Sequence, residues 1–136
     1  MHKNLILLLL AAGLIFPCFA HAGPVDGSSP CLCAITKVIE CDSQGDCAEV
    51  SPEDVNIPTF IKVDFNAKTL GGVDSSDKRT TPIKNFEQGN GYLMFQGAEN
   101  QKGWSTIVNQ KTGKLSSSVT GDGYGFLLFG TCTVLP

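Results

Sequence analysis

Short runs of β-branched and aromatic residues follow one another along residues 31–136, with turn residues between them about every 8 to 12 positions. This spacing is typical of antiparallel all-β proteins, and no stretch keeps a helical hydrophobic period over several turns. We therefore predict an all-β antiparallel meander of about seven to nine short strands. Such a meander must close as a small barrel or fold over into a sandwich, and we favour the barrel.

Three segments carry the clearest local predictions. Polar and apolar residues alternate along Thr59–Phe65, which predicts a half-buried strand. The pair Asn90-Gly91 between two strand-like runs predicts a tight hairpin. The segment Phe126–Phe129 is apolar at every position, so we expect a strand that is buried on both faces.

Residues 1–22 have the features of a secretory signal peptide. His2-Lys3 forms the basic start, Leu5–Phe16 the apolar run, and Ala20-His21-Ala22 the small-x-small cleavage site. A lipoprotein signal, which would make Cys18 the lipidated first residue, would need small residues where Phe16-Pro17 stand. The apolar run is too short to span a membrane. We expect a periplasmic or secreted protein consisting of a signal peptide (1–22), a flexible tail (23–30) and a single β domain (31–136).

Cleavage at this site would remove both histidines of the chain, His2 and His21. Mechanisms that need an imidazole are then excluded, and the sequence shows no recognisable catalytic motif. Of the ten Lys and Arg residues only Lys3 would be lost, so nine basic residues face 13 acidic ones, a net charge of −4. This charge argues against nucleic acid as a partner. We expect a non-enzymatic protein without cofactor, metal or membrane insertion.

Five cysteines remain after cleavage, so one thiol is left over in any fully paired arrangement. Cys41 and Cys47 flank a short Asp- and Gly-rich loop and can form a bridge with little strain. Cys132 must reach back to the first strand. A bridge to Cys33 would close a loop of about 100 residues and contribute roughly 4 to 5 kcal/mol, against about 2 kcal/mol for the short bridge. If Cys31 lies opposite Cys132 instead, Cys33 becomes the odd thiol.

The Cys31-Leu32-Cys33 sequence allows a second interpretation. Two thiolates this close could bind a soft ion such as Cu(I) or exchange disulfides, which would make Cys31 and Cys33 a metal or redox site. Alternatively, Cys31 is an incidental thiol in the tail, capped by a small thiol or linking two chains, so we expect a monomer or a Cys31-linked dimer. No basic residue stands beside the pair to lower a thiol pKa, which favours the interpretation of Cys31 as an incidental thiol.

Several short motifs lie in the second half of the chain: Gly91-Tyr92-Leu93-Met94-Phe95-Gln96-Gly97, Gly103-Trp104-Ser105, Thr112-Gly113 and an ending of the form Phe-Gly-x-Cys-Thr. Together they resemble a group of small exported proteobacterial β-proteins. In that group a Cys-x7-Cys segment matches Cys33 and Cys41, a third cysteine matches Cys47, and Cys31 has no counterpart. The similarity extends over most of residues 33–133. Because the group has no established activity, the resemblance implies an exported bacterial protein and no particular chemistry.

The two longest polar connections, Gly71–Asp77 and Gly97–Gly103, are the candidate recognition loops, since binding residues concentrate on loops held by a rigid scaffold. If both emerge at the same end of the barrel, a concavity would be surrounded by the polar side chains of Arg79, Glu99, Asn100 and Lys102. Trp104 either covers the core or offers a stacking surface for a sugar or peptide.

These observations favour a non-enzymatic exported binding or envelope-associated protein whose partner is an unknown protein or glycan of the cell envelope. One alternative is an inhibitor of an envelope-directed hydrolase that inserts a loop into its target. The other is a thiol or copper protein that uses the Cys31-Leu32-Cys33 pair.

Overall fold

The computed structural model describes residues 23–74 and 79–136, and the predicted signal peptide lies outside this range. The described residues form one antiparallel sheet of ten strands and a single short 3-10 helix, η1 (Glu53–Val55). The strands are β1 (Cys31–Asp42), β2 (Cys47–Val50), β3 (Phe60–Asp64), β4 (Thr69–Gly72), β5 (Thr80–Pro82), β6 (Asn85–Gly89), β7 (Tyr92–Glu99), β8 (Lys102–Asn109), β9 (Lys114–Gly121) and β10 (Tyr124–Val134).

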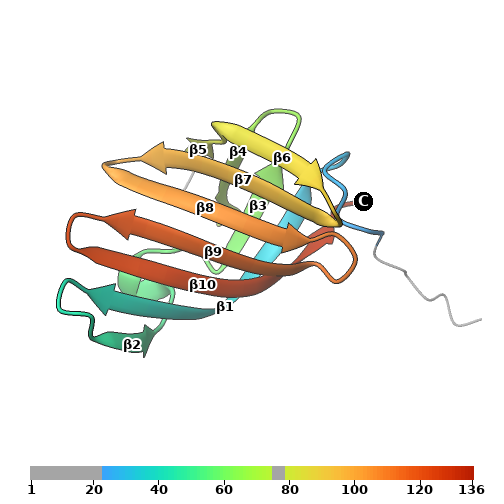
Figure 1. The fold of residues 1–136 in the computed structure, drawn as a ribbon. Helices are drawn as coiled ribbons and strands as arrows, with labels where there is room; N and C mark the ends of the chain where they lie inside the picture. The colour runs from blue at the N-terminus through green and yellow to red at the C-terminus, as the bar shows by residue number, and fades with distance from the viewer. Residues whose placement is uncertain (1–22, 75–78) are drawn as a thin grey trace, which may run out of the picture.

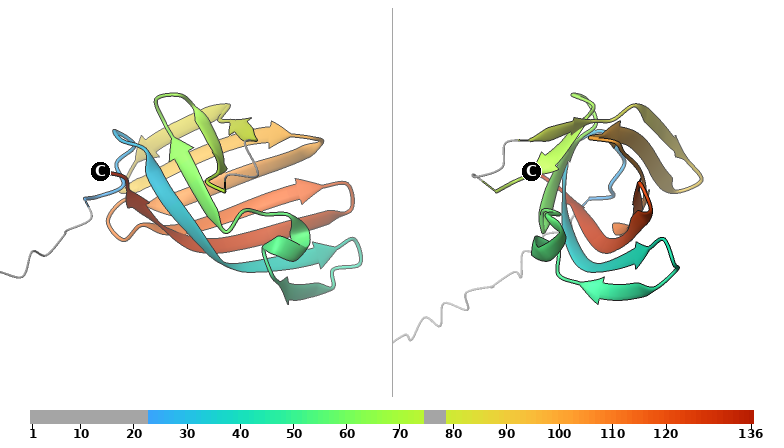
Figure 2. Two further views of the ribbon diagram at one scale, coloured as in Figure 1. Left: turned by 180° about the vertical axis from the view of Figure 1, so that it is seen from behind. Right: turned by 90° about the vertical axis from the view of Figure 1, so that its left-hand side faces the viewer.

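The sheet is a curled half-barrel (Figures 1 and 2). Its strand order is β5-β4-β3-β1-β10-β9-β8-β7-β6, and β2 pairs with the second half of β1. Six of the eight neighbouring pairs in this order are consecutive in sequence, and the first and last long strands, β1 and β10, lie side by side. The predicted all-β meander with barrel-like curvature is therefore confirmed.

The two edges of the sheet approach each other where the chain passes from β5 to β6. The amide of Ile83 donates to the carbonyl of Lys68 beside β4 (2.8 Å), and the next amide, that of Lys84, donates to the carbonyl of Gln96 on β7 (2.8 Å). Consecutive residues thus bond to opposite edges. Pro82, which has no amide proton, ends the edge strand β5 just before this crossing.

The core lies on the concave face, because alternate residues of each strand point inward. In β3 and the residue after it, Val63 and Phe65 are buried whereas Phe60 is exposed, which confirms the predicted half-buried strand. The expectation for β10 was wrong. Leu128 is only 4% exposed, but Leu127 is 46% exposed, because β10 is a central strand of a single sheet whose outer face no other described element covers.

Both predicted disulfides are present. Cys33 and Cys132 are directly opposite each other on β1 and β10, with Cα atoms 3.9 Å apart, and Cys41 and Cys47 join β1 to β2. The first bridge links residues 99 positions apart, and it fastens the first long strand to the last. In the chain-entropy account it contributes more than the short bridge, because the loop it closes is far longer.

The segment predicted as a flexible tail makes contacts that the sequence did not suggest. Val25 is 3% exposed, and its amide donates to the carbonyl of Gln110 at the turn between β8 and β9 (3.0 Å). Gly27 lies against the ring of Phe86 and the side chain of Leu93. This segment therefore covers the end of the half-barrel at which β7 begins. Within the described residues, no helix is long and apolar enough to cross a membrane.

Candidate functional site

The interior of the half-barrel contains a cavity of about 200 Å³. Residues of β1, β3, β4, β5 and β7–β10 line it, and so do Val55 of η1 and the two residues that follow, Asn56 and Ile57. Most of the lining is aliphatic or aromatic: Ile35, Val55, Ile57, Ile61, Val63, Leu70, Phe95, Trp104, Leu115, Val119, Phe126 and Leu128. A concave apolar site of this kind with a few polar groups at its margin is the usual form of a small-molecule pocket.

A polar depression of about 190 Å³, which we call the vestibule, adjoins the cavity and shares several lining residues with it. The structure brings the predicted residues Arg79, Glu99, Asn100 and Lys102 together here. Trp104 lies deeper, in the wall of the cavity itself. The two connections that we singled out therefore meet at one end of the half-barrel, although residues 75–78 of the first lie outside the described range. That these residues bind a partner stays a prediction.

The second connection is much shorter than the sequence suggested. β7 and β8 pair as far as Glu99 and Lys102, so only Asn100 and Gln101 remain as the turn. Both have positive φ, 48° and 62°, as a two-residue hairpin turn requires. Because Glu99 and Lys102 are directly opposite, their side chains lie on the same, inner face of the sheet.

Two residues of opposite charge, Glu99 and Lys102, lie at the boundary between the vestibule and the cavity and do not form an ion pair with each other. The Glu99 carboxylate accepts a hydrogen bond from the hydroxyl of the buried Thr81. The Lys102 ammonium lies 5.8 Å from the ring centre of Tyr124, within cation–π range, and no carboxylate of the described residues lies within 4 Å of it. Lys102 therefore retains unused hydrogen-bonding capacity.

Trp104 is held by its neighbours on β7. Its indole lies over Gly97, its direct partner in the sheet, where a Cβ atom would collide with the ring. Its ring also contacts Phe95 edge to face, with the ring centres 6.2 Å apart. The Nε1 atom is buried and has no acceptor within the described part of the chain. An unpaired buried donor is costly unless a water or ligand satisfies it.

Two hydroxyl groups in the cavity wall satisfy each other. The oxygens of Thr106 and Ser117 lie 2.7 Å apart, and Ser117 donates its proton to the carbonyl of Ser105 (3.1 Å). Since a serine hydroxyl has only one proton, Thr106 must donate to Ser117. Neither hydroxyl then has a proton for a ligand, whereas the Nε1 of Trp104 and the ammonium of Lys102 do.

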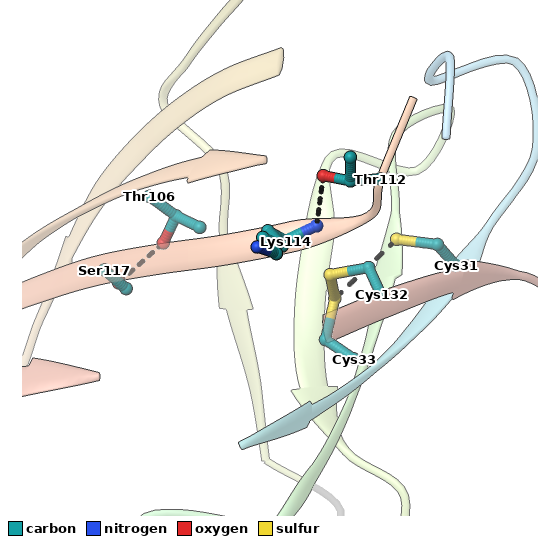
Figure 3. The surroundings of a disulfide bond; sticks show 7 residues. All are labelled: Cys31, Cys33, Thr106, Thr112, Lys114, Ser117 and Cys132. Carbon is teal, nitrogen blue, oxygen red and sulfur yellow. Dashed lines mark hydrogen bonds between the residues drawn. A yellow bond between two sulfur atoms is a disulfide. The ribbon is translucent and has the colours of Figure 1, made fainter. Parts of the chain in front are cut away.

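Three sulfur atoms gather where β1, β3 and β10 meet (Figure 3). The Sγ atoms of Cys31, Cys33 and Cys132 all lie within 4.8 Å of one another, and that of Cys31 is 3.9 Å from that of Cys33. Cys31 is a residue of β1 with 0% exposure, which corrects its predicted position in the tail. A bridge from Cys31 to a second chain would require this end of β1 to open.

This sulfur cluster is poorly suited to exchange chemistry as it stands. Burial raises the pKa of the Cys31 thiol to about 11, and the reactive form of a cysteine is the thiolate. Cys33 and Cys132 are already bonded to each other, so the disulfide must be reduced before three thiolates could bind a soft ion. The thiol or copper alternative therefore stays a prediction, and it requires that the disulfide between Cys33 and Cys132 be reduced first.

Some residues of the site were not found by sequence reasoning. Thr81, which donates a hydrogen bond to Glu99, belongs to a three-residue edge strand. Asn56 follows η1, has a left-handed backbone conformation (φ 59°) and lines the cavity. The inward alternation of β8, which places Lys102, Trp104 and Thr106 on one face, was the available signal. It could not be used for the shorter elements.

No protein-family model matches the chain, and no curated protein or solved structure is significantly similar to it. The resemblance to exported proteobacterial β-proteins stays a prediction. The candidate site therefore depends on the geometry described above.

Proposed function

We propose that this chain is a non-enzymatic exported binding protein that encloses the apolar part of a small ligand inside the half-barrel. The supporting observation is the cavity of about 200 Å³, which opens on the polar vestibule. An engineered apolar cavity of roughly 150 Å³ binds benzene, so this one has room for a group about the size of a single aromatic ring. A glycan or a protein side chain could present such a group as well as a free molecule could.

The shape of the site favours binding over catalysis. The titratable side chains that line the cavity are Glu99 and Lys102, and they flank the same turn at its margin. Catalysis by proton transfer needs such groups beside the reacting atoms. The inner surface instead offers hydrocarbon, which can bury an apolar group without reacting with it. The hydrolase-inhibitor alternative, in which a loop inserts into the target, stays a separate hypothesis.

A matched pair of substitutions on β10 tests this proposal. Leu128 points into the cavity and Leu127 points to the outer face, so Leu128→Phe fills the cavity whereas Leu127→Phe adds the same volume outside. The neutral probe is 3-phenylpropan-1-ol, and calorimetry measures its Kd. We expect binding by the unsubstituted protein, about fivefold or greater weakening in Leu128→Phe, and little change in Leu127→Phe. No binding to any of the folded proteins, or equal weakening by both changes, would overturn the proposal.

A further inference from the structure

We propose that the preferred ligand is a small monocarboxylic acid, with its apolar body in the cavity and its carboxylate bound by Lys102. This inference rests on the proposed binding function and specifies the chemical class of the ligand. It depends on which hydrogen-bonding groups at the margin of the cavity are already used and which are not.

Lys102 supplies the positive charge. It occupies an inward-facing position of β8, lines both the cavity and the vestibule, and is partly buried. The ring of Tyr124 lies within cation–π range of its ammonium but accepts no conventional hydrogen bond from it. An ammonium has three protons, and in the described residues none of them reaches a carboxylate. A ligand carboxylate would form a charge-assisted hydrogen bond here, which is stronger than a neutral one.

Lys102 repels a positively charged ligand, and Glu99, the other charged group in the cavity lining, limits the negative charge that a ligand can carry there. Glu99 already accepts the hydroxyl proton of Thr81, so its carboxylate is partly satisfied. It stands directly opposite Lys102 in the sheet, and its own charge would repel a second negative charge on the ligand. The hydroxyl protons of Thr106 and Ser117 are used within the wall. One ligand carboxylate therefore matches the ammonium of Lys102, which has no carboxylate partner among the described residues.

The size of the apolar body follows from the cavity. Its volume of about 200 Å³ exceeds the roughly 150 Å³ that accommodates a benzene ring, which leaves room for a ring and a short linker but not for a long acyl chain. The linker is needed because Lys102 lines both the cavity and the vestibule, and so stands at the margin between them. 3-Phenylpropionate has this combination of a ring, a two-carbon linker and a carboxylate.

The test compares three probes of the same shape: 3-phenylpropionate, 3-phenylpropan-1-ol and 3-phenylpropylamine. Trp104 is the single tryptophan of the chain and lines the cavity, so its fluorescence reports binding without a label, and calorimetry confirms each Kd. We expect the acid to bind about fivefold or more tightly than the alcohol, and the amine to bind least. Lys102→Gln should remove the preference for the acid and leave the affinity for the alcohol nearly unchanged.

Lys114→Gln is the control, because Lys114 is an exposed lysine at the start of β9 that lines neither the cavity nor the vestibule. The preference for the acid should persist in this variant. Equal binding of acid and alcohol, or an acid preference that survives Lys102→Gln, would overturn the charge assignment while the binding function stands. Tightest binding of the amine would also overturn this assignment, and it would make Glu99 the residue that binds the charged group of the ligand. Failure of all three probes would contradict the binding function itself.

Discussion

Cys31 shows how a buried position changes the chemistry of a single residue. The same thiol that would be reactive in a mobile tail is enclosed in β1, against the disulfide between Cys33 and Cys132. Burial disfavours the thiolate and raises the pKa of Cys31 to about 11 from an ordinary value of 9.0. The native state therefore holds this proton more tightly than the unfolded chain does.

This difference in proton affinity predicts a pH-dependent stability. Below pH 9 the thiol is protonated in both states, and the stabilisation is fully present. Between pH 9 and about 11 only the unfolded chain loses the proton, so the free energy of unfolding falls as pH rises, by on the order of 2 kcal/mol from this residue. Urea unfolding at pH 8, 9.5 and 10.5 should show this fall in the unsubstituted protein and a smaller fall in Cys31→Ala. Parallel curves for the two proteins would contradict the assignment.

A thiol titration separates the structural role of Cys31 from the thiol or copper alternative. Folded protein at pH 8 should leave a disulfide reagent such as DTNB largely unreacted, because the thiolate is scarce and the sulfur is covered. One thiol should react after unfolding in urea. Rapid reaction of the folded protein, or of more than one thiol, would favour exchange chemistry at the sulfur cluster.

At the level of single elements, turn chemistry was the most dependable guide. Asn90 and Gly91 have φ values of 52° and 80°, and they join β6 to β7 as the sequence predicts. Gly91→Ala should destabilise the protein by about 1 kcal/mol, because an alanine is strained at this φ although the space around Cβ is open. Gly89→Ala is the matched control, since its Cβ also meets open space and its φ is not positive. Equal effects of the two changes in urea unfolding would contradict the explanation.

Elements whose surroundings come from distant strands were predicted less well. The uniform hydrophobicity of Phe126–Phe129 indicated burial on both faces. Burial of the outer face would need a second layer over β10, and this local pattern cannot show whether the fold has one. The shortness of the turn at Asn100 and Gln101 was missed for a related reason. Polar and small residues of β7 and β8 near this turn are in strand conformation because the partner strand satisfies their backbones, and not because of their own propensity.

At the scale of the whole molecule, the site depends on one crossing that local sequence does not specify. β5 and β6 continue in the same direction through Ile83 and Lys84, although they bond to opposite edges of the sheet. The β4–β5 connection and the β7–β8 turn therefore emerge at the same end. A full turn at this point would have reversed β6 and separated Arg79 from Glu99, Asn100 and Lys102. The sequence identified these residues as candidates, but only the long-range pairing places them around one vestibule.

Intermolecular NOEs would locate a bound ligand within this fold. With methyl-labelled protein and 3-phenylpropionate, the ring protons of the ligand should show NOEs to the methyl groups of Leu115, Val119 and Leu128, which line the cavity. The methyl groups of Ile107 and Leu127, on the outer face, should show none. NOEs confined to the outer-face residues, or no NOEs at saturating ligand, would contradict the conclusion that the interior of the half-barrel is the binding site.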